Sequence, residues 1–302
     1  MNPKVEVERP SYTYPLLFFG ILSFSVSAIL VRYAGSAPGL AVAALRTSFA
    51  VIILAPFAFP RIKKEVRNFG GKDWLLVISG GVLLGLHFVT WIESLYHTTV
   101  AGASVILAIA PILVALLSHW LLKERLEWSL ILSILVAVTG SVLLVWGDLI
   151  RVDDVKESLL GNGLAISAAF LQAFYMIIGR VVRRSASWLA YVFPLYTVAA
   201  LTTIVAALID GTTLIGYDPS VYVLCALMAL FPQIAGHGSF NFALKYLSAA
   251  FLSLLSLLEP VIASVLAFLL FEEMPTGIAL TGMAMVLLSV GLSIRPHLVS
   301  NQ

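Results

Sequence analysis

Charged residues are scarce in this chain of 302 residues: Asp, Glu, Lys and Arg make up 11%, whereas 60% of the residues are hydrophobic. An ordinary soluble domain carries roughly 25% charged residues, so the chain lacks the polar surface that would keep it in water. It has one cysteine, Cys225, which excludes an intrachain disulfide, and no GxxxxGKS or GxxxxGKT loop that would bind a nucleotide phosphate. These absences disfavour a soluble enzyme, a nucleic-acid binder and a secreted disulfide scaffold. A mean hydropathy of +1.01 predicts an integral membrane protein.

Long apolar runs stand where the charge is missing. A helical span needs about 20 apolar residues, and the runs here are continuous and do not alternate with polar residues, which predicts helices rather than barrel strands. The first run is too long for a signal-peptide core, so we expect it to remain as a helix. The ten expected spans are approximately Tyr14–Tyr33, Pro38–Phe59, Trp74–His97, Val100–Leu122, Trp128–Gly147, Leu159–Val182, Trp188–Asp210, Val221–Lys245, Leu247–Phe271 and Thr276–Ile294.

Basic residues are unevenly distributed among the connections between these spans. One set of connections, which includes both ends of the chain, holds fourteen Lys and Arg residues, and the alternate set holds three. Basic loops stay on the cytoplasmic side of a membrane. We therefore expect a multi-pass protein of the inner (cytoplasmic) membrane with both termini in the cytoplasm, as short tails at 1–13 and 295–302.

The two halves of the chain repeat with an offset of about 149 residues, so that Ala101–Glu124 runs parallel to Ala249–Glu273. Each half has five spans, an odd number, so the second half must be inserted upside down, in agreement with the charges of the loops. We predict an all-α membrane protein with ten transmembrane helices arranged as two inverted five-helix repeats, at 14–147 and 159–294.

A proline interrupts corresponding spans in the two halves: Pro111 lies midway along the fourth and Pro260 midway along the ninth. Inverted repeats with interrupted helices are a transporter architecture, in which substrate binds near the midplane between the halves. Each proline removes a backbone donor and disturbs its helix at mid-depth, so Pro111 and Pro260 are candidate gates. The alternative is that proline is simply commoner in membrane helices than in soluble ones.

The segment SAAFLSLLSLLEPVIASVLAFLLFEE (Ser248–Glu273), its weaker copy at Pro111–Glu124 and the paired five-helix layout resemble the drug/metabolite transporter superfamily, in its EamA-like ten-helix branch. Relatives of this kind export amino acids, drugs or other small metabolites, and some carry nucleotide sugars or phosphorylated triose compounds. The resemblance implies a central cavity lined by both halves, with the fifth and tenth helices at the edge, where they face lipid or a second copy. The first half departs from the pattern, because it has Ala110 where the second half has Glu259.

Glu259 is the sharpest candidate among the ionisable residues inside the spans. An ionisable group at the bilayer centre costs about 2.5–3.5 kcal/mol on insertion scales, so each one needs a reason. Glu259 lies near the middle of its span directly before Pro260, with Ser256 one turn back. We expect it to couple transport to protons or to bind a substrate amine. The alternatives are a hydrogen bond that pins the interrupted helix, or an ion pair with Arg46.

Arg46 lies eight residues into the second span. Its planar guanidinium would suit a substrate carboxylate, and the alternative is an ion-paired or interfacial residue that reaches the membrane surface. His119 and Glu93 lie nearer the ends of their spans and are expected at the interface. Glu124 and Glu273, equivalent in the repeat, are expected to be structural loop residues.

Two histidines occupy equivalent places in the two halves, because His87 and His237 are 150 residues apart. Four residues further on come Trp91 and Asn241, and a four-residue step keeps each pair on one helix face. These polar faces must point inward, where they line a cavity or form hydrogen bonds between helices. No close carboxylate or cysteine ligand accompanies the histidines, so we expect no metal site. The expected cavity residues are His87, Trp91, His237, Asn241, Gln172, Tyr175 and Arg46.

These patterns predict a secondary transporter that exports amino acids or related compounds by alternating access, and not an enzyme. A mixed cavity would accept an apolar body with a polar head, whereas a phosphate ester or nucleotide sugar would need several basic residues at mid-depth. The alternatives are a carrier for a drug-like compound, nucleoside or phosphorylated metabolite, a passive channel, or an intramembrane enzyme that uses Ser253 or Ser256 with a histidine. The expected partners are a small-molecule substrate and the lipid bilayer, with no nucleic acid and no cofactor.

Overall fold

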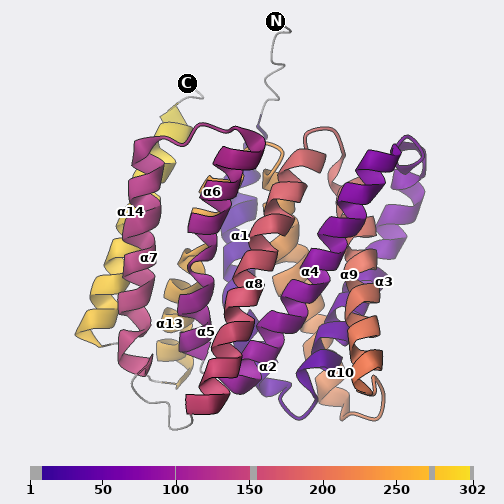
Figure 1. Cartoon of the computed structure of the whole chain (residues 1–302), viewed down its shortest axis with the longest axis horizontal. Helices are drawn as coiled ribbons and strands as arrows, with labels where there is room; N and C mark the ends of the chain where they lie inside the picture. The colour runs from indigo at the N-terminus through magenta and orange to yellow at the C-terminus, as the bar shows by residue number, and fades with distance from the viewer. Residues whose placement is uncertain (1–8, 99, 150–154, 272–275, 300–302) are drawn as a thin grey trace, which may run out of the picture.

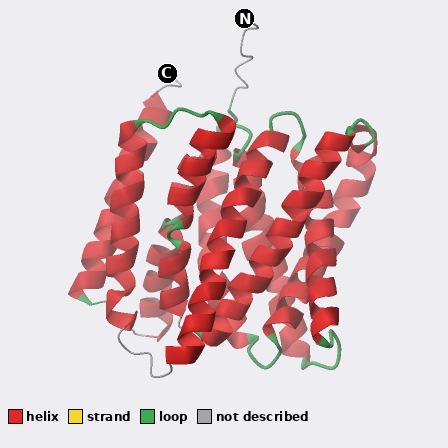
Figure 2. Ribbon diagram, in the orientation of Figure 1, coloured by secondary structure: helices red, strands yellow, loops and turns green. Residues whose placement is uncertain are grey.

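The computed structural model describes residues 9–98, 100–149, 155–271 and 276–299. Within these ranges it holds fourteen α-helices, one π-helix and no strand. The helices run side by side from one end of the molecule to the other, and short loops join them at both ends (Figures 1 and 2). In chain order they are α1 (Thr13–Ser25), α2 (Ser27–Tyr33), α3 (Gly39–Val66), α4 (Gly71–His97), α5 (Val100–Leu107), α6 (Ala110–Leu122), α7 (Trp128–Leu149), α8 (Val155–Val182), α9 (Trp188–Asp210), α10 (Pro219–Met228), η1 (Ala229–His237), α11 (Gly238–Ala243), α12 (Ala249–Ser256), α13 (Leu258–Phe271) and α14 (Gly277–Val299).

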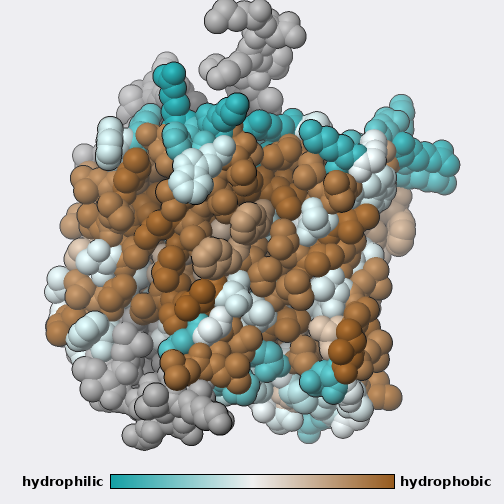
Figure 3. Space-filling view, in the orientation of Figure 1, coloured by the Kyte–Doolittle hydropathy of each residue, from teal (hydrophilic) through white to brown (hydrophobic). Residues whose placement is uncertain are grey.

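These helices confirm the predicted membrane fold. Nine helical segments of the described chain are long and apolar enough to cross a bilayer, and the remaining expected span is a shorter apolar helix, Trp128–Leu144, within α7. Apolar side chains cover a broad band of the surface, and hydrophilic side chains gather at the two ends (Figure 3). The chain is therefore a multi-pass membrane protein whose apolar band matches the hydrocarbon core.

The two halves meet through equivalent helices. Helix α3 packs along α9, its counterpart in the second half, and α7 packs along its counterpart α14. Helix α4 packs along α8, and its counterpart, the run from α10 through η1 to α11, packs in the same way along α1. A two-fold axis in the membrane plane produces this pattern of self-paired and exchanged contacts, as expected for inverted repeats.

Polar residues cap the N-terminal ends of several helices. The Ser187 hydroxyl accepts a hydrogen bond from the Ala190 amide at the start of α9, and the Ser248 hydroxyl accepts one from the Phe251 amide at the start of α12. Asp218 caps α10 through the Ser220 amide at 2.8 Å, and these hydrogen bonds lower the pKa of its carboxyl group.

Three spans are interrupted near mid-depth. The fourth breaks between Leu107 and Ala110 and the ninth at Leu257, as the two prolines indicated. Pro111 and Pro260 each lie in the first turn of the following helix, where the missing N–H would have no intrahelical partner.

The third break lies in the first span at Val26, between α1 and α2, and no proline marks it. The Ser25 hydroxyl donates to the backbone carbonyls of Ile21 at 3.0 Å and Glu259 at 3.2 Å. It therefore joins the break in the first span to the first turn of α13, directly after the break in the ninth.

The eighth span contains a π-helix, η1, which the sequence pattern did not predict. It includes Pro232, whose missing N–H removes one backbone hydrogen bond and permits a wider turn. π-Helical turns are rare and occur frequently at functional sites. This one carries Gln233 and His237, both buried.

The second span is longer than expected. It was predicted to end at Phe59, but α3 continues to Val66 and carries Arg61, Lys63 and Lys64 on its last turns. These residues are exposed, so the helix can leave the apolar band with its basic side chains in water. Cations near a helix C-terminus are also favoured by the helix dipole.

Small residues allow α7 and α14 to touch through their backbones. An added Cβ on Gly140 would lie 2.7 Å from the Gly282 carbonyl oxygen, and one on Gly282 would lie 2.5 Å from the Leu144 backbone nitrogen. We expect Gly282→Leu to force the helices apart and to cost about 1–3 kcal/mol of stability. The measurement is the midpoint of thermal unfolding in detergent, which should fall.

The matched control is Gly291→Leu in the same helix. Gly291 is exposed, and within the described chain no atom lies within 4 Å of an added Cβ there. Equal losses of stability in the two variants would show that the contact between α7 and α14 is not what the glycine protects.

Candidate functional site

A cavity lies between the two halves. Its wall includes Ser27, Ala108 and Leu257, one residue beside each of the three helix breaks, which places it near mid-depth. Of the residues expected from the sequence, the wall brings together Arg46, His87, Trp91, Gln172, His237, Glu259 and Pro260.

Arg46 is buried in this wall with 1% of its surface exposed. Its Nε donates to Gln233 Oε1 at 3.3 Å, and its guanidinium carbon lies 4.3 Å from the centre of the Phe88 ring. Its Nη2 is buried and has no hydrogen-bond partner among the described residues. The structure therefore contradicts the interfacial alternative, because the side chain does not reach the membrane surface. A buried cation with a free donor favours an anionic ligand.

Glu259 lines the same cavity. Within the described chain its carboxyl group forms no hydrogen bond or ion pair, so the pair with Arg46 considered above is not formed. The cavity thus presents a guanidinium and a carboxyl group in one wall, and neither is neutralised by the other. Gln172 adds a buried side-chain oxygen without a partner in the described structure.

Aromatic rings supply the apolar part of the wall. The His237 ring contacts Phe24 and Phe88 edge-on, with ring centres 4.8 and 5.0 Å apart, and lies 6.0 Å from the His87 ring. His87 Nδ1 lies 2.9 Å from the Ala168 carbonyl oxygen, so this nitrogen carries the proton and donates. Across the described residues, no group of three or more His, Cys, Asp or Glu is arranged to hold a metal ion.

Asn241 and Tyr175 do not line the cavity. The Tyr175 hydroxyl donates to Asn241 Oδ1 at 2.9 Å, and both side chains are buried beside the cavity. The reason is the inversion of the repeat. The step from His87 to Trp91 runs toward one end of the molecule, whereas the equivalent step from His237 to Asn241 runs toward the other.

The remaining expected residues lie elsewhere. Pro111 is buried but is not part of the wall, which includes Ala108 at that break. Glu124, expected as a loop residue, forms ion pairs with two arginines. Its counterpart Glu273 lies outside the described residues.

Sequence reasoning missed part of the wall, including Phe24 and Ser27. The repeat contained the signal for both, because Phe24 is the counterpart of Gln172, and Ser27 that of Tyr175, at an offset of 148. The contribution of Phe88 had no such signal, because it comes from the stacking of its ring against Arg46.

Comparisons with known proteins agree with this architecture. An uncharacterized transporter of Synechocystis is 27% identical over 248 residues, which are 78% of this chain and 69% of the relative. Human solute carrier family 35 member G1 is 23% identical over 92% of this chain and 79% of its own. A probable terminal-alkyne amino-acid exporter of Streptantibioticus cattleyicolor is 28% identical over 65% of this chain and 64% of its own.

A solved crystal structure shares the fold. It superposes with a TM-score of 0.79 at 18% identity and covers 94% of this chain and 97% of its own. The EamA-like transporter family matches residues 11–146 and 159–295, one match in each half. The chain belongs to the EamA-like transporter family, in the drug/metabolite transporter superfamily.

Proposed function

We propose that this transporter exports amino acids or closely related zwitterions across the cytoplasmic membrane by alternating access. The observation that carries the proposal is the presence of two oppositely charged groups in one cavity that do not neutralise each other. The Arg46 guanidinium has a free donor, and the Glu259 carboxyl group has no partner in the described structure. A zwitterion supplies the missing charge to both.

Each end of such a solute has a chemical counterpart in the wall. A carboxylate would accept hydrogen bonds from Arg46, whose planar donors match two oxygens. An ammonium group would pair with Glu259, and the apolar body would lie against Phe24, Phe88 and Trp91. The relative named as a probable amino-acid exporter supports this class of substrate.

Other solutes fit the wall less well. A phosphorylated metabolite or nucleotide sugar carries more negative charge, and Arg46 is the one Lys or Arg in the described wall of the cavity. The inverted halves favour a carrier over a passive channel, since a site between two rocking halves opens to one side at a time.

The orientation belongs to the same proposal. The end at which α1 begins is also the end at which α14 finishes (Figure 1). Most of the basic residues belong to the connections at this end, so we assign it to the cytoplasm. The two rocking units are 14–147 and 159–294.

Efflux from proteoliposomes tests the proposed substrate. Vesicles with the purified protein are loaded with mixed amino acids and small metabolites, and mass spectrometry identifies what leaves. We expect accelerated loss of amino acids, with competition by an excess of any one that is transported. Loss of phosphorylated compounds alone, or efflux no faster than from protein-free vesicles with and without an imposed pH gradient, would contradict the proposal.

A further inference from the structure

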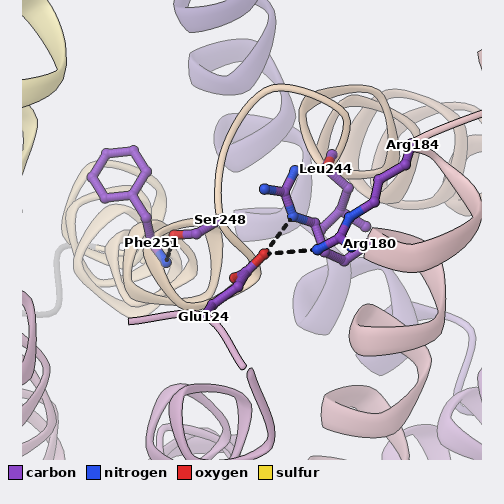
Figure 4. A network of polar contacts seen from close by, with 6 residues as sticks. All are labelled: Glu124, Arg180, Arg184, Leu244, Ser248 and Phe251. Atoms are coloured by element: carbon purple, nitrogen blue, oxygen red, sulfur yellow. Dashed lines mark hydrogen bonds and ion pairs between the residues drawn. The ribbon is translucent and has the colours of Figure 1, made fainter. Parts of the chain in front are cut away.

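A cluster of charged residues joins the two halves at the end of the molecule where α6 and α8 finish. Glu124 follows α6 in the first half, and its Oε1 accepts hydrogen bonds from Arg180 Nε at 3.0 Å and Arg184 Nη2 at 3.3 Å in the second half. Arg180 Nη1 also donates to the Leu244 carbonyl at 2.6 Å. Figure 4 shows Glu124 facing both arginines, with Ser248 at the start of α12 nearby.

The cluster is partly shielded from water. The side chains of Glu124 and Arg180 are 18% and 17% exposed, whereas Arg184 is 53% exposed. Shielding strengthens the attraction between the inner pair relative to a fully solvated surface pair. The second Glu124 oxygen, Oε2, is buried and has no partner among the described residues. Separation of the halves would return this oxygen to water and relieve the cost of burying it without a partner, which helps the closed arrangement to open again.

The cavity lies away from this cluster. Arg46 is about two turns from the start of α3, and Trp91 about two turns from the end of α4, and both of those helix ends lie at the opposite end of the molecule (Figure 1). Between the cavity and the cluster lie Asn241 and Tyr175, which are buried and bonded to each other. The halves are therefore closed on the cluster's side of the site, while the cavity extends toward the other side.

A direct connection links the cluster to the cavity. Leu244 directly follows α11, and α11 continues from the π-helix that carries His237. Arg183, next in the same arginine group, is buried and donates through Nε to the Asn241 carbonyl at 2.9 Å, and burial lowers the pKa of its guanidinium. A movement of η1 at the site would thus displace the carbonyls that Arg180 and Arg183 hold.

We propose that Glu124, Arg180 and Arg184 form the gate that closes one side of the transport path. The ion pairs break when the halves rock, and Asn241 and Tyr175 then line the opened passage as Trp91 lines the present one. This inference rests on the alternating access proposed above, but not on the identity of the substrate. Glu124 is accordingly a gating residue rather than only part of a loop.

Cysteine labelling tests the gate without a known substrate. Cys225→Ser removes the native thiol, and Asn241→Cys or Trp91→Cys introduces a reporter on either side of the site. A membrane-impermeant maleimide is applied to the side that carries the termini, identified by a terminal tag, or to the opposite side. Adding Glu124→Gln should raise labelling at position 241 from the terminal side about fivefold, as expected for loss of one partly shielded ion pair. Labelling at position 91 from the opposite side should fall.

The matched control is Glu127→Gln, which removes the same charge from the same connection. Glu127 is exposed, and in the described structure its carboxylate accepts a hydrogen bond from the Ser129 hydroxyl alone, so labelling should not change. Arg184→Gln, at an exposed position that tolerates substitution, should raise labelling at position 241 about twofold. Unchanged labelling in both Glu124→Gln and Arg184→Gln, or an equal rise in Glu127→Gln, would overturn the gate. A response in labelling without any amino-acid efflux would refute the proposed substrate and leave the gate standing.

Discussion

Arg46→Gln should reduce the apparent affinity for the transported solute about 10- to 100-fold, because a hydrogen bond to a charged group contributes about 1.5–3 kcal/mol. The free Nη2 of Arg46 points to this role, since the buried guanidinium has no carboxylate partner among the described residues and meets only the Gln233 oxygen and the Phe88 ring. The measurement is the concentration dependence of initial uptake into proteoliposomes. KM should rise, and the variant should no longer discriminate against a solute that lacks the carboxylate.

Two further variants separate binding from folding. Arg61→Gln removes the same type of residue from an exposed position on the same helix and should leave uptake unchanged. Arg46→Lys keeps the charge but loses the planar pair of donors, so it should recover only part of the affinity. An unaltered KM in Arg46→Gln would show that the guanidinium does not contact the solute.

Glu259→Gln should abolish the response of transport to a pH gradient and leave exchange of internal for external solute measurable. Glutamine keeps the shape of the side chain but cannot bind and release a proton, so the step that a proton gradient drives would be lost. Glu259 is suited to this role because it lines the cavity and its carboxyl group has no fixed partner in the described structure. The measurement compares solute flux with and without an imposed pH gradient, in the same vesicles used for exchange.

Glu93→Gln provides the comparison for this experiment. Glu93 is also a carboxyl group within a membrane helix, but it pairs with His97 at 3.8 Å and lies outside the cavity wall. Transport by Glu93→Gln should keep its response to the gradient. A full response in Glu259→Gln would assign proton coupling to another group, and loss of exchange as well would show that the solute does not bind without the Glu259 carboxylate.

Most of the helices were readable from the sequence because the bilayer imposes a strong pattern. A span must be about 20 residues of apolar helix, and the expected Trp188–Asp210 matches α9 at both ends. The repeat also predicted the breaks in the fourth and ninth spans, because its offset aligns Pro111 with Pro260.

Features that depend on packing were not readable. The break at Val26 has no proline and is stabilised by a hydroxyl that bonds across to the ninth span. The π-helix at Ala229–His237 contains Pro232, whereas Pro194 lies within an ordinary α-helix, α9. Tertiary contacts decide which of these outcomes a proline produces.

The candidate site shows the same division. The repeat predicted that His87 and His237 occupy equivalent places on inward-pointing helix faces, and their rings lie 6.0 Å apart. The same symmetry put Trp91 and Asn241 together in the cavity, yet only Trp91 lines it, because one closed conformation of an inverted repeat is not itself symmetric. The sequence shows that the two residues are equivalent in the repeat, and the conformation determines which of them lines the cavity.

Counterflow in proteoliposomes tests the central claim most directly. Vesicles with purified protein are preloaded with an unlabelled amino acid, and entry of the labelled amino acid is followed from outside without any imposed gradient. A carrier with one zwitterion site between two halves predicts transient, saturable accumulation of label that Arg46→Gln greatly weakens. Label that enters only to equilibrium, at a rate proportional to its concentration and indifferent to the preloaded solute, would contradict the account.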